Sequence, residues 1–141
     1  MIALGCDHGG FALMQEIIGH LDTMQIPYKN FGCGKNEAVD YPVYAKLVGQ
    51  AVVSGECDKG ILVCTTGVGI SIAANKIKGI RAALCADCFT AAATRAHNDS
   101  NVLCLGGGVV GPGLALKIVE TYLSTAFSEG ERHKNRIRQI E

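Results

Sequence analysis

The chain has 141 residues, of which 48% are hydrophobic and 18% charged, with 13 Lys and Arg balancing 13 Asp and Glu. This length predicts one domain, residues 1–141, with a core large enough to fold without disulfides. Zero net charge gives no global field to attract nucleic acid, and no apolar run approaches the roughly 18 residues of a membrane span. The start, MIALGCDHGG, has neither a basic stretch nor a long apolar core, so we expect no signal peptide and a cytoplasmic location.

Apolar runs typical of strands alternate along the chain with segments of helical spacing. In the first half we expect strands at Met1–Gly5 and Pro27–Phe31, helices at Phe11–Met24 and Tyr41–Val53, and a glycine-rich turn at Gly32–Gly34. Pro42 falls in the first turn of its helix, where a missing amide costs little.

In the second half we expect strands at Gly60–Val63, Ile80–Leu84 and Asn101–Leu105. The helices are expected at Gly69–Ile77, Thr90–His97, Pro112–Phe127 and, last, Gly130–Glu141. Such alternation predicts a parallel sheet covered on both faces and joined by right-handed crossovers. The predicted fold class is α/β, a Rossmann-like three-layer α/β/α domain with a five-stranded parallel sheet and a C-terminal helix.

The seven cysteines favour reduced thiols over disulfides or a metal site. Their number is odd, and several lie inside or at the end of apolar runs, where cysteine is a common core residue: Cys6, Cys64, Cys85 and Cys104. Cys85 and Cys88 form a C-x-x-C pair, which leaves a thiol redox protein as an alternative function. A structural zinc site needs a second pair at suitable spacing, and the sequence has none. We therefore expect no metal.

The most informative segment is Ile61–Ser71, ILVCTTGVGIS, where an apolar strand runs into Cys64, a glycine turn and a helix start. In a parallel α/β sheet, ligands bind beyond the carboxyl ends of the strands. Glycines let the backbone approach a ligand closely, and amides at a helix start attract negative charge. Cys64 is therefore placed where a thiolate would be favoured as a nucleophile or base.

Other polar candidates flank the first and last strands. Asp7 and His8 follow the first strand, while His97 and Asn98 precede the strand Asn101–Leu105, at the end opposite its glycines. A turn and helix cap is the plain alternative for Asp7 and His8, and a loop contact is the plain alternative for His97.

The basic last helix adds two further candidates. Arg132 and Arg136 lie four residues apart, so that they share one helix face and could fork onto a phosphate. Their plain alternative is a solvated face, and that of Cys64 is an inert buried thiol. We nevertheless expect the candidate residues to act jointly at one sheet edge.

Two motifs that suggest other functions do not fit. Gly106, Gly108 and Gly111 satisfy G-x-G-x-x-G, but a dinucleotide fold needs that fingerprint in its first βαβ unit. Cys64 does not begin the C-x5-R loop of a thiol phosphatase, because Ile70 stands at the arginine position.

Seven segments carry a family resemblance: GCDHGG, DYP at Asp40–Pro42, ILVCTTGVGISIAANK, GIRAALC, RAHNDSNVL, VVG and the closing ERHKNR. Together they make nearly the whole chain resemble the ribose-5-phosphate isomerase B family, which includes the galactose-6-phosphate isomerase subunits. The resemblance implies an enzyme that interconverts aldose and ketose phosphates through a cis-enediol, without metal or cofactor. It also implies a homodimer, or a tetramer, whose sites use both subunits.

The resemblance further implies the role of each site residue. Cys64 matches the base that moves a proton between C1 and C2, and His97 matches the residue that opens the sugar ring, with Asp7 and Thr66 as helpers. The substrate-binding loop, whose amides stabilise the enediolate oxygens, matches Thr65, Thr66, Gly67, Val68, Gly69 and Ser71. Phosphate-binding and pocket-lining positions match His8, Arg132, Arg136, Tyr41 and Asn98.

Two positions depart from the family pattern. Thr65 replaces the first glycine of the usual Cys-Gly-Thr-Gly loop, so that a positive φ there would strain it. Gly108 stands where ribose-specific members commonly carry an arginine. We expect ribose 5-phosphate and ribulose 5-phosphate as the substrate pair, with allose or galactose 6-phosphate as the six-carbon alternative. A non-catalytic sugar-phosphate sensor is a further alternative.

Overall fold

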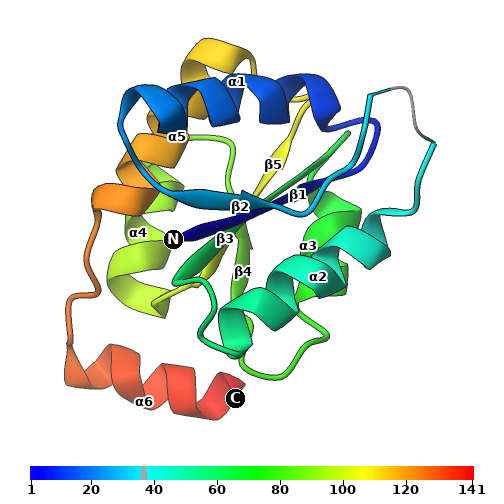
Figure 1. Ribbon diagram of the computed structural model, residues 1–141. Coiled ribbons are helices and arrows are strands. Elements are labelled where there is room, and N and C mark those ends of the chain that lie inside the picture. The colour runs from blue at the N-terminus through cyan, green and yellow to red at the C-terminus, as the bar shows by residue number, and fades with distance from the viewer. Residues whose placement is uncertain (36–37) are drawn as a thin grey trace.

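The structure, a computed structural model, describes residues 1–35 and 38–141. The strands in this part of the chain are β1 (Ile2–Cys6), β2 (Tyr28–Asn30), β3 (Lys59–Cys64), β4 (Ala82–Leu84) and β5 (Val102–Gly106). The helices are α1 (Phe11–Thr23), α2 (Tyr41–Val53), α3 (Val68–Ala74), α4 (Cys88–Asn98), α5 (Pro112–Ser124) and α6 (Glu131–Ile140). Strands and helices alternate up to α5, and α6 follows at the end of the chain (Figure 1).

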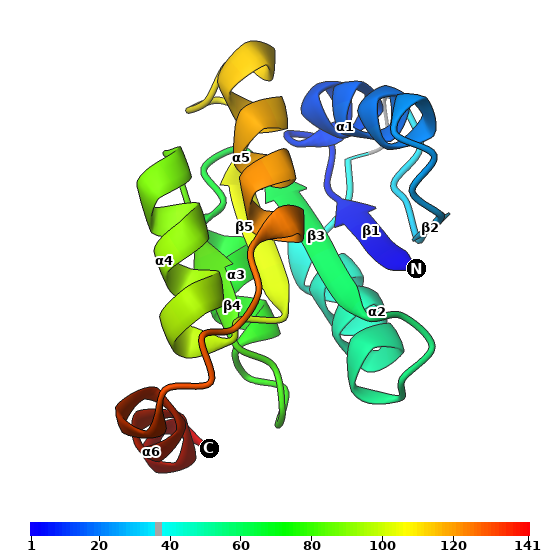
Figure 2. The same cartoon turned by 90° about the vertical axis from the view of Figure 1, so that its left-hand side faces the viewer.

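The strands pair in parallel in the order β2-β1-β3-β5-β4, which confirms the predicted five-stranded parallel sheet. Helices α1, α4 and α5 pack on one face of the sheet, and α2 and α3 pack on the other (Figures 1 and 2). This is the three-layer α/β/α arrangement that alternating strands and helices predict.

Strand β3 shows why the sheet is apolar on both faces. Successive side chains of a strand point to opposite faces, so a doubly covered strand is hydrophobic throughout. Ile61 and Val63 join the core under α1 and α5, whereas Leu62 and Cys64 join the core under α2 and α3. Each fully buried aliphatic side chain contributes about 1.5–3 kcal/mol. The core thereby holds Cys64 in place at the end of β3.

The chain leaves β1 and β3 in opposite directions along the sheet. β1 continues through α1 to β2 on one side, whereas β3 continues through α3 to β4 on the other. Neighbouring strands of this kind form a crevice beyond their carboxyl ends, where open α/β sheets bind ligands. Cys6 pairs in register with Val63, so the next residues, Asp7 and Cys64, lie side by side at this crevice.

Helix α3 ends at Ala74, before the predicted end at Ile77. The side chain of Asn75 exchanges two hydrogen bonds with the backbone of Ala82, at 2.8 and 2.9 Å. These two bonds satisfy the N–H and the carbonyl of Ala82 in β4, so the chain just after α3 is held beside that strand.

Helices α4 (Cys88–Asn98) and α5 (Pro112–Ser124) also differ from their predicted ranges. α4 begins at Cys88, before the predicted start, because the Asp87 carboxylate caps it by accepting the Thr90 N–H at 2.7 Å. α5 ends at Ser124 instead of continuing to residue 127, because Thr125 adopts extended backbone.

Helix α6 lies beyond the amino ends of the strands, on the side away from their arrowheads (Figure 2). It contacts α4, and Glu141 next to its last turn forms an ion pair with Arg81. None of the helices in residues 1–35 and 38–141 has the length and apolar character needed to cross a membrane.

Candidate active site

A cavity of about 350 Å³ lies beyond β1 and β3. Its lining residues come from the end of β1, the start of α2 and the β3–α3 segment. They are Asp7, Tyr41, Cys64, Thr65, Thr66, Val68 and Gly69. The structure thus brings these predicted site residues together at the crevice of the sheet.

Cys64 is held by the loop that follows it. Its Sγ accepts a hydrogen bond from the Gly67 N–H at 3.1 Å, and the residue is only 4% exposed. Gly67 has a φ of +77°, the left-handed region that favours glycine. A Cβ at position 67 would lie 2.5 Å from Leu84 Cδ1 and 2.8 Å from the Leu105 carbonyl carbon. Glycine is therefore required for the turn that gives the sulfur its amide partner.

The rest of the loop is fixed by two side-chain hydroxyls. Thr66 Oγ1 accepts the Val68 N–H at 3.2 Å, and Ser71 Oγ donates to the Val68 carbonyl at 2.7 Å. Ser71 is 9% exposed. Ser71 and Gly67 thus shape the loop from behind, and neither lines the cavity.

Thr65 fills the space above two glycines. A Cβ at Gly9 would lie 2.0 Å from Thr65 Oγ1, and a Cβ at Gly108 would lie 3.2 Å from Thr65 Cγ2. Thr65 is not among the described non-glycine residues with positive φ, so the strain considered for this threonine does not arise. Its exposed side chain instead forms one wall of the cavity.

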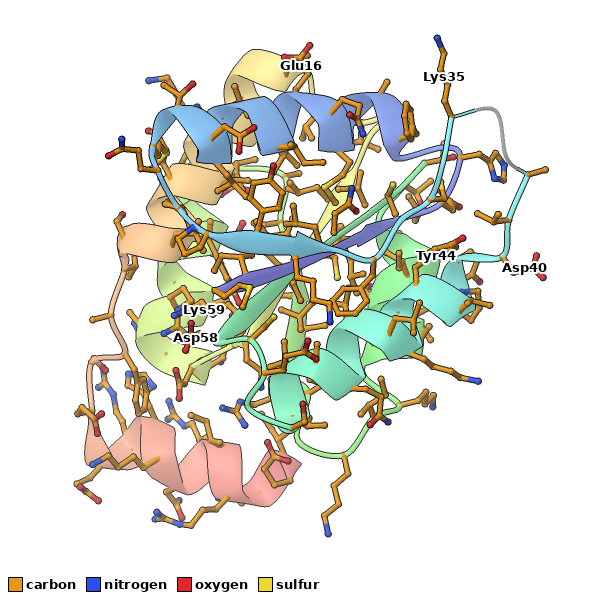
Figure 3. All side chains as sticks on the ribbon, in the orientation of Figure 1. Glu16, Lys35, Asp40, Tyr44, Asp58 and Lys59 are labelled. Atoms are coloured by element: carbon orange, nitrogen blue, oxygen red, sulfur yellow. The ribbon has the colours of Figure 1, made fainter. Side chains whose placement is uncertain are left out.

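Tyr41 lies across the loop at Gly69. A Cβ at position 69 would lie 2.6 Å from Tyr41 Cζ and 2.8 Å from its hydroxyl oxygen. Glycine at this position therefore allows the phenol to approach the loop. Figure 3 shows Asp40, the preceding residue, pointing away from the fold at the start of α2, while Tyr44 packs against Gly32 in the loop before this helix.

Asp7 and His8 are fixed by backbone amides. The Asp7 carboxylate accepts the Gly10 N–H at 3.1 Å, and the residue is 7% exposed. His8 Nδ1 accepts the Val39 N–H at 3.3 Å, which leaves Nε2 as the N–H of the neutral ring. Asp7 lines the cavity, whereas the exposed His8 stands outside it.

The other predicted site residues lie at the opposite end of the sheet. His97 and Arg132 line a separate cavity of about 510 Å³, together with Ser128, Gly130, Glu131 and His133. Arg136 follows on the exposed side of α6. Asn98 lines a third cavity, of about 580 Å³, near the end of α6, and its carbonyl accepts Arg81 Nε at 2.9 Å.

The expectation of one shared sheet edge is therefore wrong for a single chain. Cys64 pairs with Gly106 at the carboxyl end of β5, whereas His97 and Asn98 precede its amino end. Five residues at about 3.3 Å each separate the two ends by roughly 16 Å. The cause is topological, because a crossover helix carries the chain back to the amino edge before the next parallel strand begins.

His133 was not predicted as a site residue, although it lies between Arg132 and Arg136 in the segment ERHKNR. It is buried at 8% exposure, and its ring stacks on His97. The i, i+4 spacing of His133 and Ile137 on α6 was the available signal, because it marks the face of a helix turned toward the fold.

The described residues contain no group of three or more His, Cys, Asp or Glu that could hold a metal ion. All seven cysteines are free thiols. Burial raises the pKa of Cys85, whereas a redox-active thiol has a lowered pKa. Cys85 therefore lacks the lowered pKa that favours a reactive thiolate.

A family model described as Ribose/Galactose Isomerase matches residues 2–140. The chain is 50% identical over 139 residues to ribose-5-phosphate isomerase B of Escherichia coli K12, covering 99% of the chain and 93% of that protein. It is 43% identical over 129 residues to ribose-5-P isomerase B of Listeria innocua, and the match covers 92% of this chain and 87% of that protein.

Solved structures agree with these relatives. The ribose-5-phosphate isomerase B of Clostridium thermocellum matches with a TM-score of 0.96 at 50% identity, covering 99% of this chain and 93% of that one. The type B ribose 5-phosphate isomerase of Trypanosoma brucei matches with a TM-score of 0.94 at 45% identity, and the match covers 99% of this chain and 95% of that chain. The chain belongs to the Ribose/Galactose Isomerase family.

Proposed function

We propose that the protein is an aldose–ketose isomerase that interconverts D-ribose 5-phosphate and D-ribulose 5-phosphate through a cis-enediol. The observation that carries the proposal is the Cys64 sulfur, which has an amide partner and borders a cavity shared with Asp7 and Thr66. Relatives at 43% and 50% identity are named for this activity.

The proposed chemistry begins from the open-chain aldose. The Cys64 thiolate removes the proton from C2, and the electron pair moves toward the C1 carbonyl to give an enediolate. The same sulfur returns that proton to C1, and the proton of the C2 hydroxyl passes to O1, so that C2 becomes the ketone and C1 carries the new hydroxyl. The atoms of substrate and product balance without an added oxidant or reductant. Thr66 borders the cavity, and its hydroxyl together with loop amides would stabilise the enediolate oxygens.

We further propose a homodimer in which each subunit completes the site of the other. One chain cannot place His97, Asn98, Arg132 and Arg136 beside Cys64, because they lie at the other end of the sheet. Helices α2 and α3 beside the Cys64 cavity, strand β4 and the start of α4 also carry large apolar side chains that are 42–82% exposed. These are Val43, Leu47, Val68, Ile72, Leu84 and Phe89. A patch of this kind supports contact with another protein surface.

The cluster of the second subunit would open the sugar ring and hold the phosphate. His97 would exchange a proton with the ring oxygen, which a cyclic sugar requires before C2 can lose its proton. Arg132 and Arg136 would form charge-assisted hydrogen bonds with the phosphate, each contributing about 1.5–3 kcal/mol. His8 would add a donor through Nε2.

A cytoplasmic location is proposed from the cysteines. Seven free thiols, six of them buried, suit a reducing compartment. A thiol redox function receives less support, because the buried Cys85 has a raised pKa.

The test is a panel of aldose phosphates with a proton-exchange assay. Ribose 5-phosphate, allose 6-phosphate and galactose 6-phosphate are incubated with the protein in deuterated water, and ketose formation and deuterium uptake are followed by NMR. We expect the highest kcat/KM for ribose 5-phosphate. A higher value for a six-carbon sugar would contradict the ribose assignment, and phosphate binding without exchange at C2 would identify a sensor.

A further inference from the structure

His133 lies flat against His97. Their ring centroids are 4.5 Å apart, and their planes differ by 13°. The helices that carry them, α6 and α4, approach each other beyond the amino ends of the strands (Figure 2). His133 is 8% exposed, whereas His97 is exposed. A buried imidazole therefore packs against an exposed one, and both line the same cavity.

The backbone before α6 fixes the place of the His133 ring. Ser128 donates its N–H to the Ala96 carbonyl of α4 at 3.1 Å, and His133 donates its own to the Gly130 carbonyl at 3.0 Å. A Cβ at position 130 would lie 3.1 Å from His133 Cδ2. The glycine thus makes room for the ring, and the hydrogen bond to Ala96 holds this segment against the helix that carries His97.

The surroundings of His133 keep it uncharged. Burial lowers its pKa, and so do the neighbouring His97 and the guanidinium groups of Arg132 and Arg136. A histidine with a lowered pKa is neutral at pH 7. The ring therefore offers His97 a flat aromatic face without a competing positive charge.

We propose that His133 is a positioning residue that holds the imidazole plane of His97 in the orientation needed for opening the sugar ring. The inference rests on the proposed function, in which His97 performs that step. An exposed side chain samples several rotamers unless a neighbour restrains it, and a misplaced acid–base group loses rate. The stack supplies this restraint from one face of the His97 ring, at the wall of the cavity that both histidines line.

The two substrates of the proposed reaction separate ring opening from the chemistry at Cys64. Ribose 5-phosphate exists as a furanose and must be opened. Ribulose 5-phosphate carries its phosphate on O5, so it has no free hydroxyl to close a furanose onto C2. Deuterium uptake at C1 of ribulose 5-phosphate therefore reports proton transfer at Cys64 without ring opening.

We expect His133→Ala to lower kcat for ribose 5-phosphate by about tenfold or more, and to leave deuterium uptake by ribulose 5-phosphate within about twofold of wild type. His133→Phe keeps a flat ring and should restore kcat to within about threefold of wild type. Arg138→Ala, an exposed change on the same helix, is the control and should leave both reactions unchanged.

Equal losses in the two reactions would assign His133 a structural role and overturn the proposal. So would equal kcat losses in His133→Ala and His133→Phe, or no loss in His133→Ala. The ring-current shift of the His97 Hε1 proton, expected in wild type and His133→Phe but not in His133→Ala, needs no substrate. If the wild type did not isomerise ribose 5-phosphate, the proposed function would fail, while this shift would still decide whether His133 orients His97.

Discussion

Cys64 both borders the cavity and belongs to the core under α2 and α3, so a change of this one residue tests its proposed role as the base. We expect Cys64→Ala to lower kcat by about a hundredfold or more, the loss typical of a missing general base, with little change in phosphate affinity. Steady-state kinetics and phosphate titration measure the two effects. Cys104→Ala is the matched control, because Cys104 lies in the same core but not at the cavity; turnover by Cys64→Ala equal to that of this control would refute the assignment.

Thr65 and Gly108 should determine substrate length as a pair. A Cβ at position 108 would lie 3.1 Å from the Thr65 carbonyl oxygen and 3.2 Å from its Cγ2, so a side chain there requires Thr65 to shift by a few tenths of an ångström. We expect Gly108→Arg combined with Thr65→Gly to lower the KM for ribose 5-phosphate and to weaken any six-carbon activity, because the added guanidinium can reach a phosphate. The single Gly108→Arg variant should gain less. An unchanged ratio of five- to six-carbon kcat/KM in the double variant would show that position 108 does not read substrate length.

Single residues differ in how far the sequence predicts them. Cys64 and Gly67 could be placed at the crevice because an apolar run, a glycine turn and a helix start follow one another along the chain. The support that Thr65 receives from Gly9 and Gly108 could not be predicted, because it depends on contacts between three loops distant in sequence. The same holds for the stack of His133 on His97.

Among the helices, α4 depends on its amino-terminal cap. The Asp87 carboxylate accepts the Thr90 N–H at 2.7 Å, and loss of such a cap destabilises a protein by about 1 kcal/mol. We expect Asp87→Ala to lower the free energy of unfolding, measured by urea denaturation, by that amount, while Asp87→Asn or Asp87→Ser, which keep a capping oxygen, should retain most of the stability. Equal midpoints for Asp87→Ala and wild type would show that the cap contributes nothing to global stability.

Helix and strand types followed from periodicity, whereas their ends did not. The predicted positions of all five strands and six helices overlap the observed elements. The observed helix ends differ from the predicted ones where a side chain forms a hydrogen bond with the backbone. Asn75 forms such a bond after α3, and Asp87 forms one before α4. Such bonds depend on where the next element returns, as with Ala82 in β4, and hydrophobic spacing carries no information about them.

At the scale of the whole molecule, a site shared between subunits predicts complementation. Cys64→Ala and His97→Ala damage different halves of the proposed site, so a mixed dimer keeps one intact site and one that lacks both groups. Unfolding and refolding the two variants together at equal concentration should yield about a quarter of wild-type activity, because half of the dimers are mixed and each has one working site. Either variant refolded alone is the control. Activity of the mixture no higher than that of the better variant would place both groups in one subunit's site.

The separation between the Cys64 half and the His97 half of the proposed site could be predicted from the sequence only in part. The position of His97 before the last strand indicates the amino edge once the sheet is known to be parallel. The place of α6 could not be derived, because a helix after the last strand has no following strand to fix its direction, and α6 lies at the amino end (Figure 2).

The opposed positions of Cys64 and His97 make catalysis in the proposed dimer dependent on protein concentration. In that proposal a dissociated chain would keep its thiol but lack the ring-opening and phosphate groups of its neighbour. Specific activity should therefore fall on dilution below the dimer dissociation constant and recover on concentration, by mass action. Activity measured across a dilution series, beside the sedimentation coefficient, should show both transitions at the same concentration, and constant specific activity through dissociation would exclude a shared site. The enzyme's rate would then rise faster than linearly with its own abundance.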